Sequence, residues 1–105
     1  MEAFQKAIFA LNDPTRVKIL AFLIAHQSAC VCEIEASLGI LQSTLSRHLK
    51  ILHDGGFLAP RRVKTFAFYD IAPRSPLHQT LLGEVEKLSI DLPEKAQILS
   101  ACAVA

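Results

Sequence analysis

The sequence lacks the features that mark several large classes of protein. It contains no run of 18 or more apolar residues, so it has no candidate transmembrane helix and we expect no membrane partner. Its first residues, MEAFQK, lack the charged and then apolar order of a signal peptide, which indicates a cytoplasmic protein. It has no internal repeat or low-complexity tract, and its 105 residues suffice for one domain.

Arrangements typical of enzymes are also missing. The chain has only four glycines, and they form no loop of the kind that cradles a phosphate. No nucleophile stands near a base in a recognisable order, and no paired carboxylates are set in an expected cleft. We therefore predict no catalytic residues, no organic cofactor and no small-molecule substrate.

Net charge is low, but the basic residues are concentrated in one segment. The whole chain carries +1 with its histidines neutral. Between Gln42 and Lys64, five basic residues stand against the single acid Asp54, which gives this segment +4 and leaves −3 for the rest. A small domain needs only such a local patch to bind phosphates, so nucleic acid is a candidate partner.

The first 26 residues predict two helices. The first, over 2–11, is indicated by one apolar face at i, i+3, i+4, i+7 spacing: Phe4, Ala7, Ile8 and Leu11. Asp13 then caps a second helix, with Pro14 at its first position, where the missing N–H costs nothing. We expect Arg16 on the surface, with a phosphate contact as the alternative, and a loop over 26–29.

The segment 29–58 predicts a helix-turn-helix. Apolar residues at Val31, Ile34 and Leu38 indicate a short helix, which a break at Gly39 ends. A second helix runs from about residue 42 to residue 53 and is closed by two glycines. Two helices across a tight, glycine-containing turn form this motif.

The second helix of this motif has one apolar and one polar side. On a wheel of about 100° per residue, Leu45, Leu49 and Leu52 form the buried stripe. The other side suits a DNA major groove, because Arg can bond guanine and hydroxyls can bond base edges or phosphates. The alternative is a solvated amphipathic helix. The candidate DNA contacts are Gln42, Ser43, Thr44, Ser46, Arg47, His48 and Lys50, with His48 expected at the boundary, bonded to a phosphate or a backbone group.

Two β-prone runs follow, over 57–62 and 66–71, around a short basic turn at 63–65. Such a hairpin is what a winged helix uses as its wing. Arg61, Arg62 and Lys64 would then reach phosphates or the minor groove, although a basic hairpin can also be simply solvated. The predicted fold is mainly α: a winged helix-turn-helix with four helices, the hairpin, and a fifth helix.

Pro73 and Pro76 end the second strand and begin the last helix, which we expect Pro93 to break. Its apolar positions are Leu77, Leu81, Val85 and Leu88. We expect residues 1–92 to form a DNA-binding and dimerisation domain, and 93–105 a tail, with one further short helix, that carries Cys102.

Four segments resemble the ArsR/SmtB family of winged-helix repressors, and within it the arsenic-responsive branch. They are NDPTR at 12–16, CVC at 30–32, QSTLSRHL at 42–49 and GGFL at 55–58, and the similarity spans roughly 5–72 in register. The resemblance implies a homodimer that binds an operator and releases it when a thiophilic metalloid occupies the cysteines. It also implies a dimer interface on the first and last helices, with Phe4, Ile8, Leu81, Val85 and Leu88 as candidates, although these could equally fill the monomer's own core.

Three cysteines, an odd number, form no disulfide framework. Soft ions such as As(III) or Sb(III) favour thiolate sulfur, so we expect Cys30 and Cys32 to bind the inducer. Residues two apart in a regular helix point about 200° apart, so we expect binding to unwind the first turn of the helix that begins there. The third ligand would be Cys102, a cysteine of the other subunit, or a small cellular thiol.

The sequence departs from its arsenic-responsive relatives at three positions. Glu35 stands where they often have a third cysteine, Leu41 where a Ser cap is common, and Ser43 where Pro is frequent. Zinc or cadmium sensing through the last helix is disfavoured, because that helix has the single histidine His78. The alternatives left open are a regulator that responds to another soft metal or to thiol oxidation, and a protein-interaction module whose cysteines are inert, buried small residues.

Overall fold

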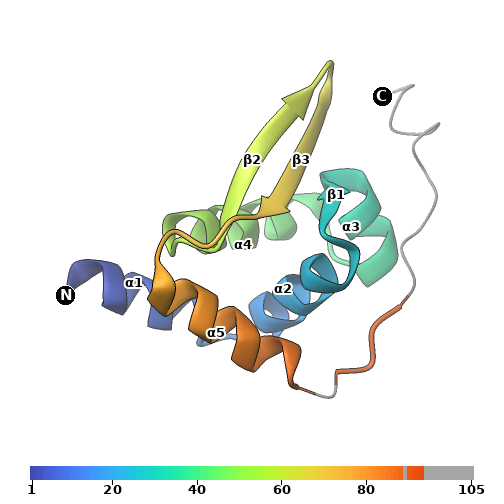
Figure 1. Cartoon of the computed structure of the whole chain (residues 1–105). Helices are drawn as coiled ribbons and strands as arrows, with labels where there is room; N and C mark the ends of the chain where they lie inside the picture. Colours follow the sequence, from blue (N-terminus) through green and yellow to red (C-terminus); the bar gives the residue numbers. More distant parts are fainter. Residues whose placement is uncertain (89, 94–105) are drawn as a thin grey trace.

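The computed structural model of the chain describes residues 1–88 and 90–93 (Figure 1). The elements follow in the order α1 (Glu2–Leu11), α2 (Pro14–His26), β1 (Ser28–Cys30), α3 (Val31–Leu38), α4 (Gln42–Asp54), β2 (Leu58–Val63), β3 (Phe66–Ile71) and α5 (Pro76–Glu86). This is the predicted winged helix-turn-helix, with one additional strand. The predicted tail helix and Cys102 lie outside the described residues.

The corner between α1 and α2 forms as its sequence predicts. Asp13 is the N-cap of α2, and its Oδ1 accepts hydrogen bonds from the backbone N–H groups of Thr15 (2.8 Å) and Arg16 (3.2 Å). Ala7 and Ala10 of α1 are fully buried, so α1 packs closely on the domain through its small residues. None of the described helices is both long and apolar enough to cross a membrane.

The helix-turn-helix is held by a continuous apolar core. Gly39 ends α3 in the left-handed conformation (φ 68°), where glycine has no Cβ penalty. Leu45, Leu49 and Leu52 of α4 are fully buried, as the helical wheel predicts. Phe57, directly before β2, is also fully buried and continues the core from α4 into the wing.

The prediction of a loop over 26–29 is wrong at Ser28 and Ala29, which together with Cys30 form strand β1 (Ser28–Cys30). The strand pairs antiparallel with β3, so the sheet order is β1-β3-β2 and Cys30 lies opposite Phe68. Three residues are too few to show a period-two pattern, and this strand exists because β3 offers it an edge. The segment that carries the first cysteine is therefore part of the wing sheet.

The wing itself is the antiparallel pair β2 and β3, which projects away from the helices (Figure 1). Its two-residue turn is Lys64 and Thr65, and Lys64 takes a positive φ of 57°. Two-residue hairpin turns require such angles, and here a lysine adopts one in the absence of glycine or asparagine. Lys64 is exposed in this turn, between the two strands of the wing.

The last helix is shorter than predicted. α5 ends at Glu86 with Lys87 as its C-cap, well before Pro93, so the proline is not what ends it. The helix packs against α2 and buries Leu82 and Val85. Val85 is 5% exposed and belongs to the core of the single chain, which is the alternative that the sequence left open for it.

Candidate DNA-binding face and thiol site

The polar side of α4 is presented to solvent as the wheel predicts. Most of the candidate DNA contacts on this helix are exposed, and Thr44 is half-buried; the exposed ones are Gln42, Ser43, Ser46, Arg47 and Lys50. The N-cap Leu41 is 75% exposed and makes no side-chain capping bond, so α4 begins without a side-chain cap. Its first N–H groups therefore remain available to an acceptor outside the helix.

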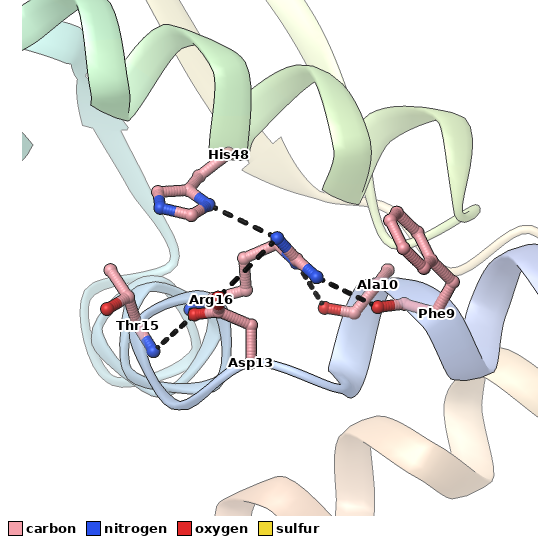
Figure 2. A network of polar contacts seen from close by, with 6 residues as sticks. All are labelled: Phe9, Ala10, Asp13, Thr15, Arg16 and His48. Carbon is pink, nitrogen blue, oxygen red and sulfur yellow. Dashed lines mark hydrogen bonds and ion pairs between the residues drawn. The ribbon is translucent and has the colours of Figure 1, made fainter.

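His48 is the exception, because it lies on the inner side of α4. The ring is 7% exposed, and its Nδ1 lies 3.4 Å from Nη1 of Arg16 (Figure 2). Its placement among the DNA contacts is therefore wrong: its partner is a buried guanidinium instead of a phosphate or a backbone group. On the wheel, His48 lies about 60° from Leu45, so the pattern already put it near the buried stripe.

Arg16 also corrects the sequence analysis, which expected it on the surface or at a phosphate. The side chain is 6% exposed. Its Nε donates to the carbonyl of Ala10 (2.8 Å) and its Nη2 to the carbonyl of Phe9 (3.0 Å), two of the last carbonyls of α1 (Figure 2). The Phe9 carbonyl also accepts from the backbone N–H of Asn12 (3.1 Å). The guanidinium also lies 5.1 Å from the centre of the Phe9 ring, a cation–π distance.

The wing carries a polar cluster that the sequence did not reveal. Arg61 donates to Asp70 through Nε (2.9 Å) and Nη2 (3.3 Å), and to Ser28 Oγ (3.2 Å). The Ser28 hydroxyl donates to Asp70 Oδ1 (2.6 Å), and the hydrogen bonds from Arg61 and Ser28 lower the pKa of the Asp70 carboxyl. Arg61, Arg62 and Lys64 are all exposed. The Arg61 guanidinium, 5.0 Å from the Phe68 ring centre, is already paired with Asp70 within the sheet.

We expect Arg62→Gln to weaken the salt dependence of DNA binding. Each phosphate contact contributes about 0.9 to the slope of log K against log salt, so the slope should fall by about 0.9 for each Arg62 in the complex. The measurement is a binding titration between 50 and 200 mM salt. As the matched control, Arg61→Gln combined with Asp70→Asn removes one charge of each sign and should leave the slope unchanged. An equal fall in that double variant would show that Arg61 contacts DNA despite its ion pair.

Cys30 and Cys32 lie together at the start of α3. Cys30 is the N-cap, with extended backbone (φ −70°, ψ 147°) and 2% exposure, and Cys32 is half-buried in the first turn. Their Sγ atoms are 2.8 Å apart while α3 is fully formed. The prediction that an intact first turn keeps the sulfurs apart is wrong, because the helix begins one residue after Cys30 and the 100° rule does not apply to the cap.

The backbone around the two thiols is fixed by a capping box. Glu33 Oε1 accepts a hydrogen bond from the Cys30 N–H (2.9 Å), and the Cys30 side chain caps the N–H of Glu33 in return. Two sulfurs on one tetrahedral ion with bonds of about 2.3 Å stand roughly 3.8 Å apart, so these sulfurs need to separate by only about 1 Å to share an ion. When both cysteines are reduced, the donor set therefore fits a soft ion.

A groove of about 370 Å³ opens beside the thiols and joins three functional elements. Its lining comes from α3, from the first residue of α4 and from the wing: Cys30, Val31, Cys32, Glu35, Gln42, Thr65, Phe66 and Ala67. Within residues 1–88 and 90–93, no group of three or more His, Cys, Asp or Glu side chains is placed to hold a metal ion. The described part of the chain thus offers two cysteine sulfurs, of which Cys30 carries a thiol and Cys32 is disulfide-bonded. The predicted third ligand, Cys102, lies outside the described residues.

The residues predicted for the dimer interface differ in how exposed their side chains are. Phe4 (46%), Ile8 (44%) and Leu88 (52%) are exposed, Leu81 is half-buried, and Val85 is in the core. Large apolar side chains exposed on α1 and just beyond α5 are a feature of surfaces that a partner covers.

A family model described as "Bacterial regulatory protein, arsR family" matches residues 13–59. A helix-turn-helix-type transcriptional regulator of Methanocaldococcus jannaschii, itself uncharacterized, is 45% identical over 68% of this chain and 83% of its own length. The arsenical resistance operon repressor of Bacillus subtilis is 31% identical over 68% of each chain. The homodimeric winged helix-turn-helix domain of a possible ArsR-family regulator of Mycobacterium bovis is 27% identical, with a TM-score of 0.69 over 81% of this chain and 76% of that one.

Proposed function

Because this chain belongs to the arsR family of bacterial regulatory proteins, we propose that it is a homodimeric, cytoplasmic repressor that As(III) or Sb(III) releases from operator DNA. The ion would be held by the thiolates of Cys30 and Cys32. The observation that carries the proposal is the 2.8 Å contact between the two sulfurs, in a groove that also touches α4 and the wing.

The DNA-binding part of the proposal rests on the exposed polar and basic side chains of α4 and the wing. The polar side of α4 would enter the major groove, with Arg47 able to bond guanine and Ser43 and Ser46 able to bond base edges or phosphates. Arg62 and Lys64 of the wing would neutralise phosphates beside it. In the dimer, the exposed apolar side chains Phe4, Ile8 and Leu88 would meet their counterparts.

The release mechanism follows from the position of the groove. Cys30 ends β1, which pairs with β3 of the wing, and Gln42 at the start of α4 forms another wall. When the sulfurs separate to share an ion, a shift of the Cys30 backbone would displace it from Phe68, its partner across the ladder. The wing and the start of α4 would then change position relative to each other, so the arrangement that binds DNA would become less favourable. Coupling of this kind is typically about 1–3 kcal/mol.

The experiment is a titration of the full chain with arsenite in the presence and absence of its own upstream DNA. We expect specific binding below micromolar protein, release on addition of arsenite, and growth of thiolate-to-arsenic absorbance with the loss of two or three reactive thiols per chain. Absence of sequence-specific binding would instead favour a protein-interaction module.

The sulfur contact also suits a response to thiol oxidation or to another soft metal, since both act on the same thiolates. Release by peroxide under conditions where arsenite has no effect would favour oxidation. Release by cadmium or zinc alone would favour a divalent ion. Either result would leave the proposed repressor function standing and would change only the proposed inducer.

A further inference from the structure

The buried Arg16 side chain joins three helices. It leaves the first turn of α2, and its Nε and Nη2 donate to the last carbonyls of α1, at Ala10 and Phe9 (Figure 2). Its Nη1 points to His48 on the inner side of α4 (Figure 2). One guanidinium therefore fixes the end of α1, which carries the exposed apolar residues Phe4 and Ile8, against the helix that presents Arg47.

The chemistry of this contact sets the state of the His48 ring. A guanidinium has only donors, so Nδ1 of His48 must accept and must carry no proton. The ring is therefore neutral, with its proton on Nε2. A protonated ring would have donors at both nitrogens and would face the Arg16 cation at 3.4 Å with no acceptor to offer.

We infer that Arg16 and His48 are positioning residues for operator recognition: the neutral His48 ring fixes α4 to the end of α1 through Arg16, and protonation of the ring releases it. This inference rests on the proposed operator binding but not on the metalloid. It assigns a function to the side of α4 that faces away from DNA. It also makes the placement of α4 depend on α1, the helix proposed to form part of the dimer interface.

The charges around the ring determine when it becomes protonated. Burial is the largest effect and lowers the pKa of His48; the negative charge of Asp13 raises it, and the positive charges of Arg16 and Arg47 lower it. Asp13 and Arg16 belong to the start of α2, and Arg47 is the neighbour of His48 on α4 itself. The His48 ring is therefore neutral at pH 7. It becomes protonated only at a pH below the ordinary pKa of a histidine side chain.

The test compares three variants of the full chain for operator affinity. His48→Asn places an amide oxygen near the position of Nδ1, where it accepts from Arg16 at any pH, whereas His48→Leu offers no acceptor. At pH 7.5 we expect His48→Asn to bind operator within about twofold of the parent, and His48→Leu to bind about fivefold or more weakly, the lower end of coupling between sites. His53→Asn, on the same helix, is the matched control and should bind as the parent does.

The same proteins are then compared as the pH is lowered stepwise to the lowest pH at which they remain folded, with the folded fraction checked by circular dichroism. Protonation of surface histidines favours DNA binding, so His48→Asn should gain affinity or keep it. The parent and His53→Asn should instead lose about fivefold or more relative to His48→Asn. Parallel pH profiles of the parent and His48→Asn would overturn the inference, as would full affinity of His48→Leu at pH 7.5. A folded parent that binds no operator at pH 7.5 would overturn the proposed function and this inference with it.

Discussion

The double variant Cys30→Ser, Cys32→Ser is expected to bind operator DNA as the parent does and to remain bound when arsenite is added. Hydroxyl oxygen is a poor ligand for a soft ion, so the substitution removes the two donors that lie 2.8 Å apart and changes little else in size. Arsenite should lower the operator affinity of the parent by about 5- to 150-fold, the usual range for linked sites, and that of the variant by less than about twofold. A fluorescence anisotropy titration with and without arsenite measures both.

Serine is the suitable replacement because position 30 caps α3. The Cys30 side chain and Glu33 form the capping box, and serine is among the residues preferred in that place. The start of α3 should therefore survive, and lost release cannot be attributed to a lost helix turn. The control is Cys102→Ser alone, which shows whether the tail supplies the third sulfur. If the double variant is released as readily as the parent, the sensing site lies elsewhere in the chain.

The fold was predictable where one pattern repeats over several turns. The spacing of Leu45, Leu49 and Leu52 identifies the inner side of α4, and the pair of Asp13 and Pro14 marks the start of α2. These signals are local, because a helix period or a cap needs only neighbouring residues. The exposed contacts on the opposite side of α4 follow from the same wheel.

The predictions that were wrong concern residues whose place depends on a distant partner. Arg16 is buried because two carbonyls at the end of α1, His48 of α4 and the Asp13 carboxylate, 3.8 Å from Nη1, surround its guanidinium. Of these partners, the spacing along the sequence indicates only Asp13. Strand β1 likewise depends on β3, some forty residues later. Charged residues are almost never fully buried unless paired, so a sequence alone favours the surface for them.

The geometry of the thiols could have been predicted from a signal that was present. Cys30 is followed three residues later by Glu33, which is the spacing of a capping box with cysteine in the place of serine. Such a cap has extended backbone, so its side chain is not on the helical wheel of the residues that follow. The two sulfurs meet for this reason, and α3 need not unwind to bring them together.

Gly56→Ala is expected to destabilise the domain by roughly 2–5 kcal/mol, because a methyl group at this position combines backbone strain with a steric overlap. Gly56 follows the end of α4 with φ +94°, and a Cβ there would overlap Nε2 of His78. The His78 ring cannot easily move: it is 3% exposed, its Nε2 donates to the Gly55 carbonyl (2.8 Å), its Nδ1 accepts from the Ser75 hydroxyl (2.7 Å), and it packs edge-on to Phe57.

Substitutions of two other glycines, compared by urea unfolding, distinguish the backbone strain from the steric overlap as the cause of the lost stability. Gly39 has φ +68° but open space around a Cβ, so Gly39→Ala should cost only about 1–2 kcal/mol from backbone strain. Gly83 lies within α5, also with open space, and Gly83→Ala should stabilise by about 0.5–1 kcal/mol. If Gly56→Ala costs no more than Gly39→Ala, the His78 ring yields to the methyl group. A larger loss would show that His78 holds the end of α4 to the start of α5, so that the polar side of α4 keeps its direction relative to the rest of the domain.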